Sequence, residues 1–147
     1  MNHGENKHGA HGEEQQFPVK RSTLSWREDQ TMARVIGCAI AVHRELGPGF
    51  LESIYQRAMA LELDARGLSF EQERAVPVSY RGTQIPGQRI DLIVEGLIIV
   101  ELKSVSRFDD VHVAQVISYL RTTKLRAGLL MNFRVSQLHK GIKRIVL

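Results

Sequence analysis

The stretch LIIVELKSV at residues 97–105 constrains the fold more than any other part of the sequence. Its four consecutive apolar residues, 97–100, are typical of a β-strand that is covered on both faces, and such a strand does not normally end in charged residues. Glu101 and Lys103 nevertheless follow directly, and because they are two residues apart they lie on one face of the strand. The sequence therefore predicts a core strand that ends in a carboxylate and an ammonium group.

Two helices are predicted before this strand. Apolar side chains recur at helical spacing from residue 28 onward, and the sequence GPG at 47–49 ends the first helix. A second amphipathic pattern then runs to Gly67. The predicted buried stripes are Met32, Val35, Ile36, Ala39, Ile40, His43 and Leu46 in the first helix, and Leu51, Ile54, Ala58 and Leu61 in the second.

After Gly67 the pattern changes to that of strands. Turn sequences at Arg81-Gly82, Pro86-Gly87 and Glu95-Gly96 divide residues 69–105 into three predicted strands. A third helix follows, which Asp109 or Asp110 can cap, and then RAGLLMNF at 126–133 and IKRIVL at 142–147 as strands. This order predicts a single domain of mixed α/β or α+β class. The predicted stripe of the third helix is Val113, Val116, Ile117 and Leu120.

Composition excludes several classes of protein. The single cysteine, Cys38, excludes an internal disulfide framework and fits a reducing compartment, so we expect a cytoplasmic protein in which Cys38 is a packed side chain. No apolar run reaches the roughly 18 to 20 residues of a membrane helix, so no membrane partner is expected. Residues 1–27 are polar, rich in His and Gly and without a secretory signal, which predicts a disordered tail before a domain at 28–147. The tail histidines His3, His8 and His11 are interpreted as solvated.

A third charged residue, Asp91, interrupts the apolar strand RIDLIV before the core strand. A two-residue turn at Glu95-Gly96 would put Asp91 and Glu101 on opposite faces of the sheet. A three-residue turn that includes Leu97, or a bulge near Asp91, would put them on one face. Two carboxylates this close repel unless a proton or cation lies between them, and hard oxygen ligands favour Mg²⁺ or Mn²⁺ over zinc. The alternative is a structural ion pair or a solvated strand end.

Three stretches of the sequence resemble the GxxExxY protein family. They are HRELGPGFLESIY at 43–55, RIDLIVEGLIIVELKSV at 89–105 and QVISYLRTTKLRAGLLMNF at 115–133, and Gly49, Glu52 and Tyr55 match the signature that names the family. The resemblance spans about residues 28–146. This family is grouped with the PD-(D/E)xK nuclease-like superfamily, so the resemblance implies a restriction-endonuclease-like αβββαβ core with a central mixed sheet flanked by helices. The order of elements predicted above is the same.

The resemblance also implies roles for particular residues. Asp91, Glu101 and Lys103 match the D…ExK triad, although Ile90 stands where the superfamily motif has proline. The two acids would bind Mg²⁺, with Mn²⁺ as a substitute. Other implied site residues are Glu52 from the second helix, the carbonyl of Leu102 as a further metal ligand, Tyr55, and Gln115 with Tyr119 as a QxxxY element.

Structural roles are the alternative for several of these side chains. If Gly49 caps the second helix, Glu52 falls at its third position, where a carboxylate suits the helix dipole. Tyr55, one turn on, can pack or bond to Glu52. Gln115 and Tyr119, together with His112, can form the solvent-exposed polar face of an amphipathic helix.

The charge distribution points to a polyanionic partner. Residues 100–147 hold 9 Lys or Arg against 3 Asp or Glu. The expected nucleic-acid contacts are Lys103, Arg107, Arg121, Lys124 and Arg126. The sequence thus predicts a Mg²⁺-dependent phosphodiester hydrolase acting on nucleic acid. The alternative is a non-catalytic module on a nuclease-like scaffold that binds nucleic acid or a protein partner.

Overall fold

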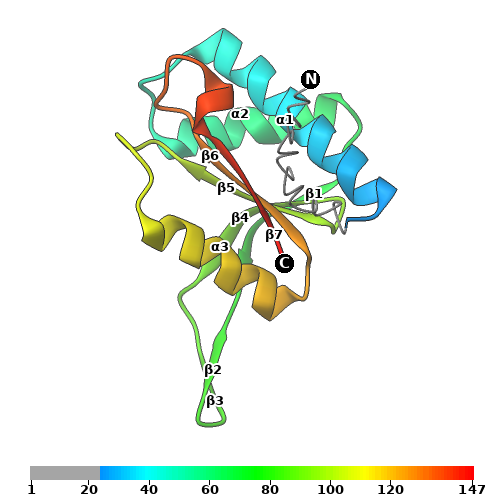
Figure 1. Cartoon of the computed structure of the whole chain (residues 1–147), viewed down its shortest axis with the longest axis vertical. Coiled ribbons are helices and arrows are strands. Elements are labelled where there is room, and N and C mark those ends of the chain that lie inside the picture. Colours follow the sequence, from blue (N-terminus) through cyan, green and yellow to red (C-terminus); the bar gives the residue numbers. More distant parts are fainter. Residues whose placement is uncertain (1–23) are drawn as a thin grey trace, which may run out of the picture.

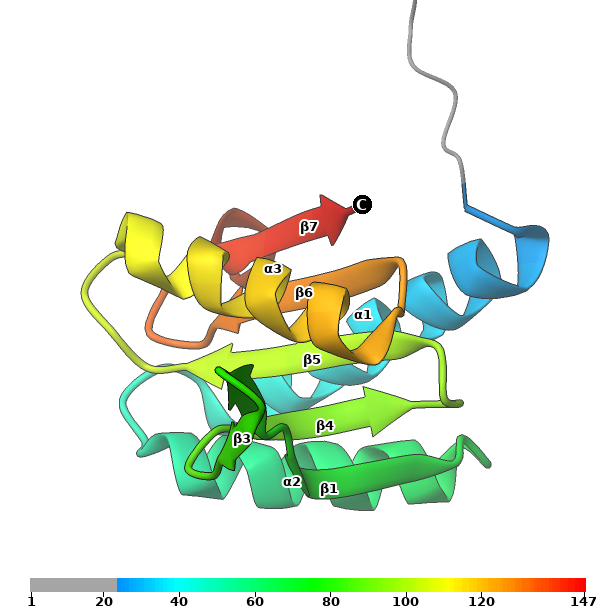
Figure 2. The same cartoon turned by 90° about the horizontal axis from the view of Figure 1, so that it is seen from below.

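A five-stranded mixed β-sheet separates two helical layers in the computed structural model, which describes residues 24–147 (Figure 1). Helices α1 (Trp26–Leu46) and α2 (Glu52–Ala65) cover one face of the sheet, and α3 (Asp110–Thr123) covers the other (Figure 2). The predicted mixed fold is confirmed. Most of the predicted tail, with its three histidines, lies outside the described residues.

The strand order of the main sheet is β1-β4-β5-β6-β7. Only β5 and β6 are parallel, and α3 forms the crossover between them. Residues 98–102 of β5 are all buried, which confirms a central strand covered on both faces. The strands are β1 (Phe70–Ala75), β4 (Arg89–Val94), β5 (Ile98–Lys103), β6 (Ala127–Asn132) and β7 (Ile142–Val146), and the short 3₁₀ helix η1 (Leu138–Gly141) precedes β7.

The prediction of three strands between residues 69 and 105 is wrong, because this segment forms five. Strands β2 (Val78–Tyr80) and β3 (Thr83–Ile85) pair only with each other, as a hairpin that projects from the body of the protein (Figure 1). Pro77 and Pro86 flank the hairpin, and proline cannot donate to a sheet ladder. The two prolines therefore separate the hairpin from β1 and β4.

The observed helix starts correct two predictions. Helix α1 begins at Trp26 rather than at residue 28, because Ser25 and Glu28 form a capping box in which each side chain accepts the other's backbone N–H. Helix α2 begins directly at Glu52, with Leu51 as its N-cap, so Glu52 is the first helical residue and not the third. Asp109 is the N-cap of α3, and it is one of the two capping residues predicted from the sequence.

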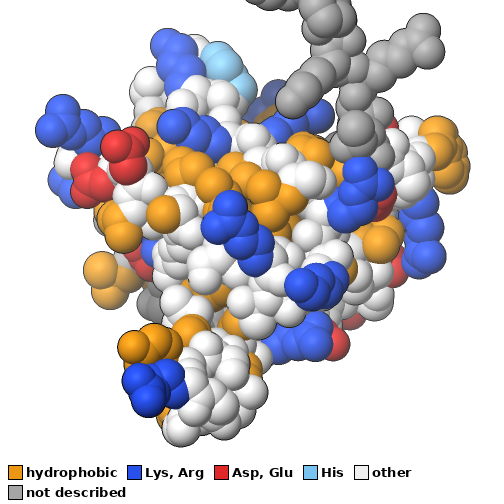
Figure 3. Space-filling model, turned by 60° about the horizontal axis from the view of Figure 1, so that its bottom comes forward, with side chains coloured by type: hydrophobic (Ala, Val, Ile, Leu, Met, Phe, Trp, Pro, Cys, Tyr) orange, Lys and Arg blue, Asp and Glu red, His pale blue; other side chains and the backbone are white. Residues whose placement is uncertain are grey.

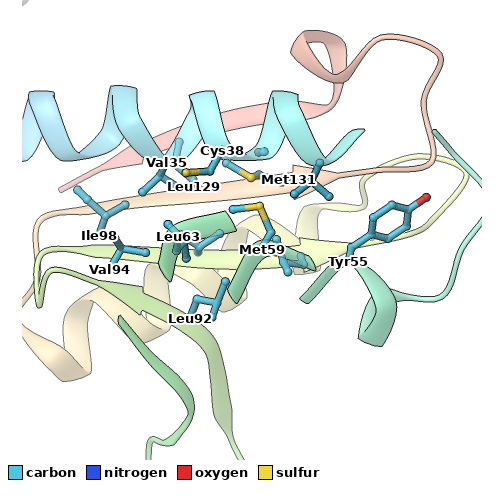
Figure 4. Packing of buried hydrophobic residues seen from close by; sticks show 14 of the residues in the cluster. Val35, Cys38, Tyr55, Met59, Leu63, Leu92, Val94, Ile98, Leu129 and Met131 are labelled. Carbon is cyan, nitrogen blue, oxygen red and sulfur yellow. The ribbon is translucent and has the colours of Figure 1, made fainter. Parts of the chain in front are cut away.

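The larger hydrophobic core lies between the sheet and helices α1 and α2 (Figure 4). Cys38 is fully buried there, which confirms its packing role. His43 is also buried, with Nε2 2.8 Å from the carbonyl oxygen of Val135, so it is a core histidine. A second core cluster lies between the sheet and α3.

The predicted buried stripe of α2 is wrong. Leu51, Ile54 and Leu61 are 75%, 45% and 56% exposed, and the helix instead buries another stripe at helical spacing. The rotation of the helix is fixed by Tyr55, whose ring stacks on Phe133 with centroids 4.4 Å apart. The buried residues of α2 are Tyr55, Met59, Ala60 and Leu63.

Within residues 24–147, no helix combines the length and the apolar character that crossing a membrane would require.

Candidate active site

The turn between β4 and β5 has the length that brings the two acids together. Val94 pairs with Ile98, so the three residues 95–97 lie between the paired positions. Continuing the same register along the strands places Asp91 opposite Glu101. The three-residue turn proposed from the sequence is confirmed, and Glu101 lies on the face of the sheet that α3 covers, as Ile99 does two residues earlier.

The two acids replace the ordinary ladder of hydrogen bonds at this point of the sheet. Glu101 Oε1 accepts the backbone N–H of Asp91 at 3.0 Å, and Asp91 Oδ2 accepts the backbone N–H of Leu102 at 2.9 Å. On the other side of β4, Glu73 faces Asp91 but has a positive φ of 52° and is missing from the regular β1–β4 register. The strands thus open locally around the two carboxylates.

The environment of this pair favours protonated carboxyl groups. Burial, followed by the charge of Asp91, raises the pKa of Glu101 to about 8. Burial also raises the pKa of Asp91, with the hydrogen bond from the Leu102 amide opposing the rise. Lys103 Nζ lies 4.0 Å from Glu101 Oε2, a distance too long to offset the burial of this carboxyl group. The pair therefore retains a proton near neutral pH unless a cation takes its place.

Glu52 adds negative charge from the opposite helical layer. It begins α2, and its Oε1 accepts the backbone N–H of Ser104, just beyond the end of β5, at 3.3 Å. Its charge contributes to the raised pKa values of Asp91 and Glu101. Glu52 is therefore near the pair.

A family model described as the PD-(D/E)XK nuclease superfamily matches residues 29–145, which is most of the chain. The chain belongs to this superfamily. The three residues that the resemblance assigns to the D…ExK triad, Asp91, Glu101 and Lys103, lie together where β4 begins and β5 ends. The likeness to the narrower GxxExxY family remains a resemblance. Comparison with curated proteins and with solved structures gave no significant match.

The polar pair on α3, Gln115 and Tyr119, lies near Asp91 and Glu101. Gln115 Nε2 donates to Tyr119 Oη at 2.9 Å, and the Tyr119 hydroxyl donates to the carbonyl oxygen of Arg89 at 3.0 Å. Burial raises the pKa of Tyr119, and the charges of Glu101 and Asp91 raise it further. The interpretation of these residues as a solvent-exposed helix face is wrong for Tyr119, which is 1% exposed. His112 belongs instead to the cap of α3.

Two other predicted site residues have structural contacts. The Tyr55 hydroxyl donates to the carbonyl oxygen of Gly47 and accepts the backbone N–H of Phe50, so it fixes the α1–α2 connection and not the position of Glu52. The Leu102 side chain is buried in the larger core, and its amide holds Asp91.

The predicted basic residues lie at two different ends of the sheet. Arg107 is exposed in the segment after β5, at the same end as the acids. Ile98 pairs with Ala127, so residues at the start of β6 lie at the opposite end of β5 from Lys103. The structure places the other predicted phosphate contacts, Arg121, Lys124 and Arg126, toward that opposite end.

Sequence reasoning missed three residues around this end of the sheet. Glu73 contributes to the raised pKa of Asp91, and its contact with β4 comes from a non-local pairing. Lys143 lies at the start of β7, and its Nζ is 5.9 Å from the centroid of the Phe108 ring. Asn132 accepts the backbone N–H of Val105 at 3.1 Å and donates to its carbonyl oxygen at 2.8 Å. An asparagine in the otherwise apolar run LLMNF was the one available signal.

Replacing Asn132 with Ala should destabilise the protein by about 2 kcal/mol, because the peptide groups of Val105 lose their partners. Urea denaturation would measure this loss. Gln137→Ala, at an exposed position after the same strand, is the matched control and should leave the midpoint unchanged. An unchanged midpoint for Asn132→Ala would show that the two hydrogen bonds do not hold the segment after Lys103.

The donor set at the site fits a hard divalent cation. Across residues 24–147, no group of three or more His, Cys, Asp or Glu side chains is arranged to hold a metal ion. The pair Asp91 and Glu101 does supply two carboxylates, and Mg²⁺ usually retains several waters and takes only one or two carboxylates from a protein. A cation would also relieve the repulsion that contributes to the raised pKa of Glu101.

Proposed function

We propose that the protein is a divalent-metal-dependent nuclease whose centre consists of Asp91, Glu101 and Lys103. Membership of the PD-(D/E)XK nuclease superfamily supports phosphodiester hydrolysis as the chemistry. The observation that carries the proposal is the opposition of Asp91 and Glu101 across the β4–β5 hairpin, with the pKa of Glu101 raised to about 8. A structural role alone would not require two buried carboxyl groups that disfavour each other's charge.

Asp91 and Glu101 would hold the cation, Mg²⁺ or Mn²⁺, in this proposal. The carbonyl oxygen of Leu102 is an additional candidate ligand, and Glu52 is near enough to contribute through water. When bound, the ion supplies charge neutralisation at the phosphate and a more acidic water molecule. Because the carboxyl pair retains a proton near neutral pH, that proton must leave before the cation is held. Cleavage is therefore expected to increase with pH up to about pH 8.

Lys103 and Gln115 would act on the water and the phosphate. Lys103 is on the same strand face as Glu101, and its side chain is only 16% exposed. Its ammonium group would position the attacking water or stabilise charge that develops on the phosphate. Gln115 donates its amide N–H to Tyr119, which leaves its carbonyl oxygen to orient a water molecule.

A cleavage assay with Asp91→Asn tests the proposal. The purified parent should cut DNA or RNA with Mg²⁺ or Mn²⁺ and not with EDTA. Asp91→Asn should reduce the rate by about a thousandfold, because several kcal/mol of transition-state stabilisation are lost. Asp64→Asn, at an exposed position of α2, is the matched control and should cut as the parent does. Equal rates for the parent and Asp91→Asn would reject the assignment of the site.

A non-catalytic nucleic-acid-binding module is the second candidate function. The observation that favours it is that both acids already accept backbone N–H groups, Glu101 from Asp91 and Asp91 from Leu102, which is a structural use of the two carboxyl groups. Such a module would bind nucleic acid with an affinity that falls as salt increases, and would not cut with Mg²⁺ or Mn²⁺. The cleavage assay above therefore separates the two functions.

A further inference from the structure

The hairpin of β2 and β3, here called the arm (residues 76–88), is the most prominent projection of the structure. It extends on the α3 side of the sheet, beyond α3 itself (Figure 1). Seen from below, it lies in front of the end of the sheet where β4 begins and β5 ends (Figure 2). Asp91 follows the start of β4 at Arg89 by two residues, so the arm emerges directly beside the acids.

One face of the arm is apolar and has no partner among residues 24–147. Val78 pairs with Ile85 and Tyr80 with Thr83, and directly paired residues of antiparallel strands share a face. Val78, Tyr80 and Ile85 are 41%, 66% and 47% exposed. An isolated two-stranded hairpin is marginally stable in water, and a ligand on its apolar face would remove this surface from water.

The charge of the arm fits a polyanion. No Asp or Glu occurs between Arg74 and Arg89, and Arg81 stands at the tip next to Gly82. On the face seen in Figure 3, Lys and Arg side chains are widely spread, and the arm is the lobe at the lower left, with hydrophobic side chains beside a basic one. The acids of the site, which repel a polyanion, lie in the sheet and not on the arm.

The base of the arm is fixed to the site. Val76 is buried in the cluster under α3, and its N–H donates to the carbonyl oxygen of Gln88 at 2.8 Å. Tyr119 holds the other side of the base through the carbonyl oxygen of Arg89. At the tip, Arg81 and Gly82 both have positive φ, 49° and 78°, as in the tight turns that join twisted strands. The arm is thus anchored and regular.

We propose that the arm enters the major groove of a DNA duplex and holds it against the site. The proposal rests on the proposed function, since it names the substrate of the same site. The major groove of B-form DNA is wide enough for a two-stranded β-ribbon, whereas the major groove of A-form RNA is too narrow. Arg81 at the tip reaches base edges or phosphates, and Tyr80, Val78 and Ile85 contact thymine methyl groups or sugars.

Binding measured in EDTA tests the arm without requiring cleavage. The probes are a labelled DNA duplex, one of its single strands, and the RNA duplex of the same sequence, followed by fluorescence anisotropy. The parent should bind the DNA duplex more tightly than the other two. Arg81→Asn removes the charge and leaves Asn-Gly, the preferred sequence for this turn, so the arm should keep its shape. Arg81→Asn should weaken duplex binding about tenfold. The slope of log affinity against log salt concentration should become shallower by about one, because one phosphate contact is lost.

Two further variants complete the experiment. Tyr80→Ser should also weaken duplex binding, whereas Arg57→Gln, an exposed position on α2, should not. If Arg81→Asn and Tyr80→Ser bind the duplex as tightly as the parent, the proposal is overturned. It is equally overturned if Tyr80→Ser converts a self-associated parent into a monomer without changing DNA affinity, because the apolar face then contacts a second copy. Loss of cleavage in any variant without loss of binding concerns the proposed function alone.

Discussion

Glu101→Gln is expected to eliminate metal-stimulated cleavage and, at the same time, to make the metal-free protein more stable in alkaline solution. The loss of cleavage follows from the removal of one of two carboxylates that would hold the cation. The gain in stability follows from burial and the neighbouring Asp91 charge, which raise the pKa of Glu101 from 4.5 to about 8. Glutamine can still accept the Asp91 N–H through its carbonyl oxygen.

The direction of this stability effect depends on pH. Below about pH 4.5, Glu101 is protonated in both the folded and unfolded states. Between pH 4.5 and about 8 only the folded state retains the proton, so the free energy of unfolding of the parent falls as pH rises. The fall is about 1.4 kcal/mol per pH unit. The glutamine of the variant has no proton to release, so the free energy of unfolding of the variant does not show this fall with pH.

Thermal unfolding in EDTA at pH 5 and pH 9 would measure the difference. At pH 9 the Glu101→Gln variant should be more stable than the parent by roughly 5 kcal/mol, or on the order of 15 °C in Tm. At pH 5 the two should be nearly equal. Glu45→Gln, an exposed position on α1, is the matched control and should follow the parent at both values. A Glu101→Gln protein that is less stable than the parent at pH 9 would mean that Glu101 is held by a favourable ion pair with Lys103.

Divalent cations are expected to raise the Tm of the parent, and to raise it more at high pH. A cation that binds only the folded state stabilises it by about 2.7 kcal/mol at a hundred times its Kd. Because binding displaces the proton from the carboxyl pair, the apparent Kd should weaken about tenfold for each pH unit below the Glu101 pKa of about 8. The Tm shift with Mg²⁺ or Mn²⁺ should therefore be large at pH 9 and small at pH 6.

Asp91→Asn should remove most of the Tm shift at pH 9, whereas Asp64→Asn should retain it. This comparison needs no substrate, so it tests the cation site separately from cleavage. Equal shifts for the parent and Asp91→Asn would place the cation elsewhere on the protein. A shift that is the same at pH 6 and pH 9 would show that no proton is exchanged for the cation.

The central part of the site was predictable because it depends on short sequence separations. Asp91 and Glu101 are joined by one turn, and the length of this turn sets the register that pairs them. Glu73 and Asn132 could not be assigned in this way. Their roles depend on the pairing of β1 with β4 and on the segment after β5, which are non-local contacts.

Errors in the fold prediction have an equally specific origin. In α2, the set that begins with Leu51 and the set that begins with Tyr55 both recur at helical spacing, so period alone cannot decide which is buried. The stacking of Tyr55 on Phe133 decides it, and Phe133 is far away in the sequence. The arm was missed although Pro77 was available as a sign that β1 ends there.

The three-residue turn at 95–97 has a consequence for how related sequences should be compared. Loss of one residue from this turn would shift the pairing of β5 with β4 by one residue. Glu101 and Lys103 would then point to the opposite face of the sheet, into the larger core. All three charged letters of the motif would survive in such a sequence, but the cation would have no pair of oxygens to bind. The spacing of nine residues between the two acids is thus as diagnostic of the proposed cation site as the acids themselves.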